Sequence, residues 1–251
     1  MDDKVALITG GTTGIGLATA HRLLAAGHVV MMASRNRERG QQVVADLCSE
    51  RVGFHQVDVS DEMAVASLVD ATLDRFGRLD CLFNNAGVEG TVGPMGAWTA
   101  DDVDAVLSVN VKGAFLCMKH AAAHMKEGSV IVNCSSLLAT IPMLMAAPYA
   151  ASKAALLSLT RSAAAELSGS GIVVLAICPG IVDTPMMDRV SLSTGAPKSV
   201  LAEMVCPSRQ VTSPDRIAEV VTALLANPTS FASGSALRIG PDALEQICPG
   251  P

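Results

Sequence analysis

Residues 9–16 read TGGTTGIG and join an apolar run, Val5–Thr9, to a helical pattern, Gly14–Ala26. Glycine lets the backbone turn tightly and approach a pyrophosphate, and a helix start offers free N–H groups and a positive dipole end. A glycine cluster alone can be only a turn, but its place between a strand and a helix favours dinucleotide binding. The contacts are expected from Gly10, Thr12, Thr13, Gly14, Ile15 and Gly16.

The rest of the chain repeats this alternation of short apolar runs and longer helical patterns. The expected strands are Val5–Thr9, His28–Ala33, Val52–Val57, Leu79–Phe83, Ser129–Cys134 and Ile172–Cys178; the expected helices include Gly14–Ala26, Asp61–Phe76, Asp101–Met125 and Tyr149–Leu167. Most runs are apolar throughout, which is typical of parallel strands covered on both faces. The sequence therefore predicts one α/β domain over residues 1–251, a Rossmann-like, doubly wound parallel sheet with helices on both faces.

One segment, residues 185–212, has the least regular pattern of the chain. Long irregular segments in compact domains are often functional, so this one is a candidate substrate lid. The alternative is an ordinary surface excursion. A helix is expected directly after it, because Ser213, Pro214 and Asp215 form an N-cap, a first-turn proline and a first-turn acid.

Composition argues against several classes of function. The formal net charge is −6 with no compensating cluster of Lys and Arg, which disfavours a nucleic-acid partner. No apolar run approaches the ~20 residues that span a bilayer, and the first residues, MDDK, do not form a signal peptide, so no membrane association is expected.

The seven cysteines are odd in number and include no CxxC, which indicates a reduced, cytoplasmic location. His120 and His124 have a zinc-compatible spacing but no evident further ligand, so no metal site is expected.

The end of the second expected strand bears on the choice of dinucleotide. An acidic residue there would bind the ribose hydroxyls and repel a 2′-phosphate. This chain instead has Ser34, which is small and neutral, followed by Arg35, whose guanidinium suits a phosphate. NADP(H) is therefore the preferred cofactor, with NAD(H) possible, although the arginines of this region can also simply solvate a helix start. Asp58, followed by Val59, closes the third strand and either meets the adenine or caps a turn.

The catalytic candidates are Tyr149 and Lys153, four residues apart at the start of a helical pattern. That spacing places both side chains on one helix face. A free phenol has a pKa of ~10, and a neighbouring ammonium favours the phenolate and lowers that pKa. Ser136, just past the strand Ser129–Cys134, can hold a carbonyl oxygen. A lone tyrosine is more often a packing residue, but this chain has only one and it falls here.

Together these motifs resemble the short-chain dehydrogenase/reductase family in its compact form of about 250 residues. The resemblance rests on six motifs in the expected order, which are TGGTTGIG at 9–16, NNAG at 84–87, Asn110 in VNVKG, SS at 135–136, YAASK at 149–153 and PGIVDTPM at 179–186. It implies that Tyr149 is the acid/base, that Ser136 polarises the substrate oxygen, and that Lys153 holds the nicotinamide ribose and depresses the phenol pKa. It also implies that Asn110 supports a water-linked proton path to Lys153.

The resemblance also implies further cofactor contacts. Asn85, Ala86 and Gly87 would line the cofactor side, and Ile181 and Thr184 would meet the nicotinamide carboxamide after the turn at Pro179 and Gly180. Hydrogen bonding within turns and helices is the alternative role for the asparagines. The chain departs from the family at Ala139, at Leu175 and over residues 238–242, RIGPD. The last departure affects the usual C-terminal subunit contact, and none affects the proton-transfer set.

The expected function is hydride transfer between NADP(H) and a small-molecule carbonyl or secondary alcohol. The alternatives are an NAD-dependent dehydrogenase of a cyclic alcohol or diol, and a non-catalytic dinucleotide sensor, which would not need the acid/base set. Alanine-rich faces on the helices 101–125 and 149–167 predict a homo-oligomer, with a tetramer favoured because family members pair these helices. These alanines could instead pack only against the subunit's own sheet.

Overall fold

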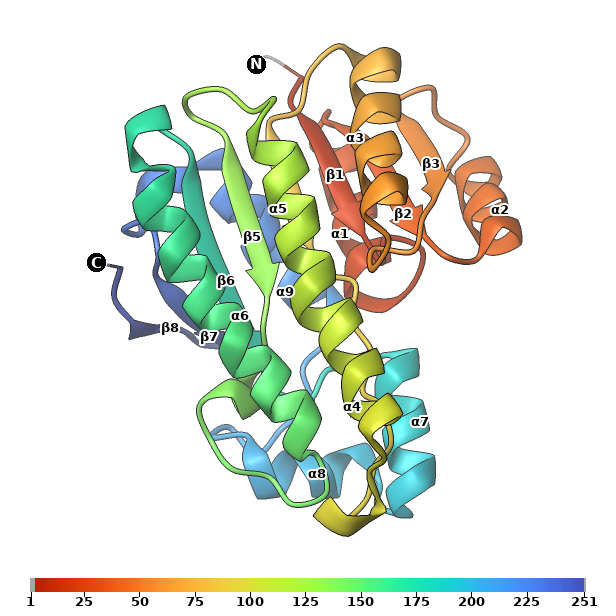
Figure 1. Ribbon diagram of the computed structural model, residues 1–251, viewed down its shortest axis with the longest axis vertical. Helices are drawn as coiled ribbons and strands as arrows, with labels where there is room; N and C mark the ends of the chain where they lie inside the picture. The colour runs from red at the N-terminus through yellow and green to blue at the C-terminus, as the bar shows by residue number, and fades with distance from the viewer. Residues whose placement is uncertain (1–2, 251) are drawn as a thin grey trace.

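A computed structural model of the protein describes residues 3–250, which fold around a single eight-stranded sheet (Figure 1). The strand order is β3-β2-β1-β4-β5-β6-β7-β8. The strands are β1 (Val5–Thr9), β2 (Val29–Ser34), β3 (Val52–Gln56), β4 (Cys81–Asn84), β5 (Val130–Cys134), β6 (Val173–Pro179), β7 (Ala236–Ile239) and β8 (Leu244–Cys248). All neighbouring strands pair in parallel except β7 and β8.

Helices cover both faces of the sheet, as the continuous apolar strands require. The helices are α1 (Gly14–Ala25), α2 (Arg37–Leu47), α3 (Glu62–Phe76), α4 (Ala100–Leu107), α5 (Ala114–Ala122), α6 (Ala147–Glu166), α7 (Pro185–Thr194), α8 (Lys198–Val205) and α9 (Pro214–Ala226). One buried cluster joins the sheet to α1, α2 and α9, and a second joins it to α3, α5 and α6 (Figure 1). The predicted doubly wound parallel sheet in one domain is confirmed.

The strand order reverses between β1 and β4, which are neighbours although β2 and β3 lie between them in the chain. In an open α/β sheet, ligands bind outside the carboxyl ends of the strands at such a switch point. The loop that follows β1 and the segment that follows β4 therefore both reach the expected binding crevice.

Three segments differ from the sequence-based expectation. The predicted helix 101–125 consists of α4 and α5 joined by a π-helical turn, Ser108–Gly113. Residues 185–212 contain α7 and α8 rather than irregular chain; α7 has no fully buried residue and α8 has only eight residues, so neither presents a long apolar stripe in the sequence. Strands β7 and β8 were not among the expected strands; β8 exists because residues 240–243 form a tight turn, with Gly240 N–H donating to Ala243 O at 2.9 Å, which returns the chain antiparallel to β7.

No helix described between residues 3 and 250 has the length and apolar character that a membrane-spanning helix requires.

Candidate active site

The loop after β1 is fixed directly to the segment after β4. Thr9 Oγ1 accepts hydrogen bonds from the N–H groups of Asn85 and Ala86, both at 3.0 Å. Asn85 Nδ2 in turn donates to Thr9 O and Gly10 O, each at 3.1 Å. A Cβ atom on Gly16 would lie 2.3 Å from Gly10 O, so only glycine fits where α1 meets this loop. The result is a backbone cradle of the kind that fits a diphosphate.

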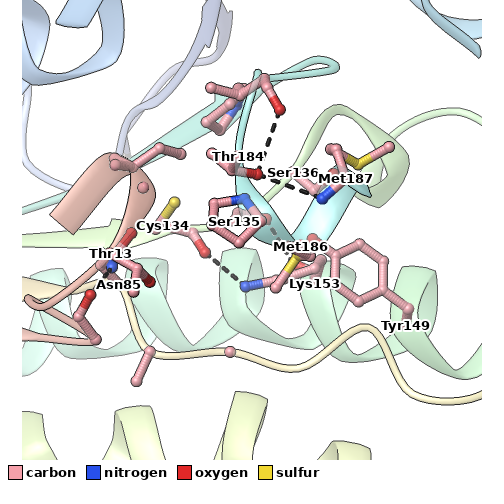
Figure 2. Close-up of a pocket in the computed structure, with 18 of the residues that line it drawn as sticks. Thr13, Asn85, Cys134, Ser135, Ser136, Tyr149, Lys153, Thr184, Met186 and Met187 are labelled. Atoms are coloured by element: carbon pink, nitrogen blue, oxygen red, sulfur yellow. Dashed lines mark hydrogen bonds between the residues drawn. The ribbon is translucent and has the colours of Figure 1, made fainter. Parts of the chain in front are cut away.

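Two cavities follow this cradle along the carboxyl edge of the sheet. The central cavity, of about 200 Å³, is drawn in Figure 2. Of the predicted residues, it is lined by Gly10, Thr13, Gly14, Ile15, Asn85, Ala86, Gly87, Ser136, Tyr149, Lys153, Pro179, Gly180 and Thr184. The outer cavity, of about 410 Å³, adds Thr12, Ser34, Arg35, Asp58 and Val59. The structure thus brings together nearly all of the predicted cofactor residues, although Gly16 lies behind the loop and Ile181 lies elsewhere.

The position of Ile181 differs from the prediction that it meets the nicotinamide carboxamide. Its N–H donates to Cys206 Sγ at 3.2 Å, its carbonyl accepts from Thr212 N at 2.8 Å, and its side chain packs in an apolar cluster. The next residue, Val182, lines the central cavity. Val182 forms a parallel bridge with Thr212, whose hydrogen bonds use Ile181 O and Asp183 N. The N–H of Val182 itself therefore points away from Thr212. Strand alternation, which inverts the direction of each successive residue, could have indicated that Val182 rather than Ile181 faces this cavity.

Tyr149 and Lys153 lie on the first turns of α6 and face the central cavity together with Ser136 (Figure 2). Ser136 caps a short 3₁₀ turn, where its Oγ accepts from Leu138 N at 3.2 Å, and this contact fixes the hydroxyl at the end of β5. Lys153 is only 4% exposed, and its ammonium donates to Cys134 O at 2.8 Å. It lies 5.6 Å from the centre of the Tyr149 ring.

The environment of Tyr149 changes its proton affinity in the direction opposite to the sequence-based expectation. Desolvation raises the pKa of Tyr149 above its ordinary value, and this effect exceeds the lowering by its hydrogen bond with Ser136. Burial also lowers the pKa of Lys153, because the charged form loses water. Burial of the phenol therefore outweighs the proximity of the ammonium, and this raised pKa keeps the Tyr149 hydroxyl protonated at neutral pH.

Asn110 lies in the π-helical turn and is 1% exposed. Its Oδ1 accepts from Val88 N at 2.8 Å, while its Nδ2 donates to Val88 O at 2.9 Å and to Ser152 Oγ at 3.0 Å. A Cβ atom on Gly87 would lie 3.3 Å from both Asn110 Oδ1 and Lys153 Nζ. The Asn110 side chain thus holds the segment after β4 beside Lys153.

The outer cavity contains a cationic residue that sequence reasoning did not single out. Arg39 lines it, and its Nε donates to Thr12 O at 3.1 Å, while Thr12 Oγ1 donates to Ser34 Oγ at 3.2 Å. The available signal was the N-cap at Asn36, which accepts from Arg39 N at 2.9 Å and places Arg39 on the first turn of α2. Two guanidinium groups, those of Arg35 and Arg39, therefore line the cavity beside Ser34.

Asp58 also lines the outer cavity, but its carboxylate is engaged in a turn. Its Oδ1 accepts from Ser60 N at 2.9 Å and from Ser60 Oγ at 2.7 Å. The bond from the Ser60 hydroxyl is the main reason that the pKa of Asp58 lies below its ordinary value. The turn-capping alternative is therefore present in the structure, and one carboxylate oxygen is left for a ligand.

An apolar cavity of about 280 Å³ adjoins the central one. Its walls come mainly from the segment after β5 and from residues 185–212, and include Leu137, Leu138, Met143, Leu144, Met145, Ile181, Val190, Leu201, Met204 and Val205. Ser136 and Tyr149 line this cavity as well as the central one. The two hydroxyl-bearing side chains therefore lie where the two cavities meet.

The histidine pair noted in the sequence lies away from these cavities. His120 Nε2 is 3.3 Å from Glu62 Oε1, which also accepts from Lys119 Nζ at 2.6 Å. Across residues 3–250, no three His, Cys, Asp or Glu side chains are grouped so that they could hold a metal ion.

The sequence is similar to a well-populated group of enzymes. The family model for short chain dehydrogenases matches residues 4–194. Levodione reductase of Leifsonia aquatica is 36% identical over 247 residues, covering 94% of this chain and 92% of that protein. The cis-4-hydroxycyclohexanecarboxylate dehydrogenase of Sinomonas cyclohexanicum is 35% identical over 243 residues, covering 94% of this chain and 95% of that protein.

Solved structures give the same result. A crystal structure of levodione reductase superposes with a TM-score of 0.87 at 35% identity, covering 95% of this chain and 96% of that one. ElxO with NADP bound gives 0.86 at 29% identity, covering 95% and 98% of the two chains. A 3-ketoacyl-(acyl-carrier-protein) reductase from Brucella melitensis complexed with NADH gives 0.85 at 29% identity, covering 95% and 97%. The chain therefore belongs to the short-chain dehydrogenase/reductase family, which confirms the prediction of an NAD(P)-dependent oxidoreductase.

Proposed function

We propose that the protein transfers a hydride between NADP(H) and a carbonyl or secondary alcohol on an apolar ring, with Tyr149 as the acid/base. The observation that carries this proposal is the position of Ser136 and Tyr149, which line both the central cavity and the apolar cavity. A substrate oxygen bound between the Ser136 and Tyr149 hydroxyls would place the carbonyl carbon at the boundary between the apolar cavity and the central cavity. This geometry is what general acid catalysis of carbonyl reduction requires.

The residues of the cradle fit a nicotinamide dinucleotide. The segment Gly10–Gly16 and the start of α1 would hold its diphosphate, and Asn85, Ala86 and Gly87 would border its ribose. When bound, the cofactor supplies or accepts the hydride. Ser136 would donate to the carbonyl oxygen and hold it in place, and the Tyr149 hydroxyl would give its proton to that oxygen as the hydride reaches the carbon. The buried Lys153 ammonium lies beside Gly87, at the place expected for the ribose hydroxyls.

The raised pKa of Tyr149 keeps the phenol protonated at neutral pH, which suits reduction. In the opposite direction the alcohol proton passes to a phenolate, so oxidation is expected to accelerate with rising pH. Reduction and oxidation use the same side chains, and a rise in pH favours oxidation over reduction.

Two observations support a cyclic, largely apolar substrate. The apolar cavity is lined chiefly by Leu, Met, Ile and Val side chains. A hydroxycyclohexanecarboxylate, named for one relative, carries a secondary alcohol on a cyclohexane ring. The second candidate is an NAD-dependent dehydrogenase of a cyclic alcohol or diol; the NADH-bound neighbour supports its choice of cofactor. Arg35 and Arg39 beside Ser34 support NADP(H) over NAD(H).

We also propose a cytoplasmic homo-oligomer, with a tetramer favoured. Phe115 on α5 is 47% exposed, and the outer face of α6 carries small side chains such as Ala151 and Ala154. A large exposed aromatic side chain beside a face of small side chains is suited to close helix pairing.

Residues 185–212 would act as the substrate lid, because α7 and α8 supply one wall of the apolar cavity.

The test is Tyr149→Phe, measured against a panel of cyclic ketones and alcohols with NADPH and NADH. Loss of the hydroxyl should lower turnover by at least ~10²-fold, the usual scale of general acid/base catalysis, without preventing cofactor binding. NADPH binding by fluorescence and the thermal midpoint serve as controls for folding. Turnover within a few-fold of the wild type would exclude Tyr149 as the acid/base, and tighter binding of NADH than NADPH would favour the second candidate.

A further inference from the structure

A bidentate ion pair joins the lid to the segment after β4. Arg189, on α7, donates from Nε to Glu89 Oε1 at 2.5 Å and from Nη2 to Glu89 Oε2 at 3.0 Å. The two residues are 100 positions apart in the chain, and the Glu89 side chain is 17% exposed. This contact raises the pKa of Arg189, and the fork geometry fixes the plane of its guanidinium.

Arg189 lies at the junction of the two cavities that would hold the cofactor. It lines both the central and the outer cavity, and the other residues that do so are Gly10, Thr13, Ala86 and Gly87. A dinucleotide with its nicotinamide end in the central cavity and its adenosine end in the outer one must pass its diphosphate through this shared zone. Arg189 is therefore beside the expected path of the diphosphate.

The part of the loop after β1 that lines the shared zone has no charged side chain. Gly10 and Thr13 offer backbone and hydroxyl groups but no charge. Arg35 and Arg39 line only the outer cavity, and Lys153 lines only the central one, where it donates to Cys134 O. Among the described residues that line these cavities, Arg189 is the only cation common to both.

We propose that Arg189 is a cofactor-binding residue supplied by the lid, with the diphosphate of the dinucleotide as its ligand. This inference rests on the proposed function. A guanidinium has five N–H donors, and Glu89 takes one from Nε and one from Nη2, so the donors of Nη1 remain for a phosphate oxygen while the pair persists. Binding of the cofactor would thereby hold α7 in place, since the same side chain would contact the ligand and the body of the domain.

The experiment compares Arg189→Gln with Lys198→Gln, a matched loss of one lid cation. Lys198 bonds Asp183 and Asp188, both at 2.5 Å, and lines neither cofactor cavity. The measured quantities are the dissociation constants of NADPH, NADH and adenosine 2′-monophosphate, which has no diphosphate. Arg189→Gln should weaken NADPH and NADH alike by about tenfold or more, the scale of one charge-assisted hydrogen bond. It should leave adenosine 2′-monophosphate unchanged, and Lys198→Gln should alter none of the three.

The outcomes separate this inference from the proposed function. If the wild type binds neither dinucleotide, the proposed function fails. If the wild type binds both and Arg189→Gln binds them equally well, the role of Arg189 is refuted while the function stands. A parallel loss of adenosine 2′-monophosphate affinity, or an equal effect of Lys198→Gln, would also overturn the assignment, because the effect would then come from the lid as a whole. A selective loss of both dinucleotides supports it.

Discussion

Replacing Lys153 with methionine is expected to stabilise the cofactor-free protein while abolishing its activity. Lys153 is 4% exposed, and its ammonium donates one hydrogen bond, to Cys134 O at 2.8 Å; among residues 3–250 no carboxylate forms an ion pair with it. Burial lowers the pKa of Lys153, which means that the folded state pays to keep this group charged. Methionine has a similar length, is unbranched and carries no charge.

The magnitude follows from two opposing contributions. Desolvating an unpaired ammonium costs several kcal/mol after relaxation. The variant regains this cost but leaves Cys134 O without its donor, a loss of ~1–3 kcal/mol. A net gain of about 1–2 kcal/mol in the free energy of unfolding is expected at pH 7, which corresponds to a rise of roughly 2–8 °C in Tm for a domain of this size.

The dependence on pH gives a second test of the same reasoning. Because the folded pKa of Lys153 is lowered, the unfolded state binds more protons between that pKa and the ordinary lysine value of ~10.4. The wild type therefore gains stability from this group as pH rises through that window. The advantage of Lys153→Met is full below the folded pKa and shrinks toward pH 10.

The assay is thermal or urea unfolding of both proteins at pH 7 and near pH 10, without cofactor. The control is Lys126→Met, because Lys126 is exposed and its replacement should change stability by less than about 0.5 kcal/mol. A variant less stable than the wild type at pH 7, or a stability difference that is the same at both pH values, would refute the assignment of Lys153 as a costly buried charge.

Three further predictions concern the loop, the outer cavity and assembly. Gly16→Ala should destabilise the protein by ~1–3 kcal/mol or abolish NADPH binding, since its Cβ would lie 2.3 Å from Gly10 O. The control Gly169→Ala, whose Cβ would have no atom within 4 Å, should do neither, and equal behaviour of the two variants would contradict the proposed cradle. Arg39→Gln should weaken NADPH more than NADH because it removes a cation from the outer cavity; equal losses measured by fluorescence titration would place Arg39 away from the 2′-phosphate. Light scattering at micromolar concentration should give a multiple of the 25.8 kDa chain mass, and a monomer would disprove the homo-oligomer.

The fold and the core of the site could be predicted from sequence because they depend on short-range patterns. Continuous apolar runs between helical patterns predicted the parallel sheet, and the spacing of Tyr149 and Lys153 predicted that they share one face of α6. The glycine pattern at 9–16 predicted the loop after β1. Each of these signals lies within a few residues, where backbone geometry alone fixes how side chains are placed.

Other features were decided only by the tertiary structure. The pairing of Glu89 with Arg189 joins positions 100 residues apart, and a bridge to Thr212 determines that Val182 rather than Ile181 lines the central cavity. The direction of the Tyr149 pKa also depended on the whole fold: the spacing to Lys153 indicated a lowered pKa, whereas the surrounding chain removes water and raises it. Sequence spacing fixes which groups can be neighbours along an element. The desolvation of a group and its partners from distant segments arise only when the whole chain encloses it.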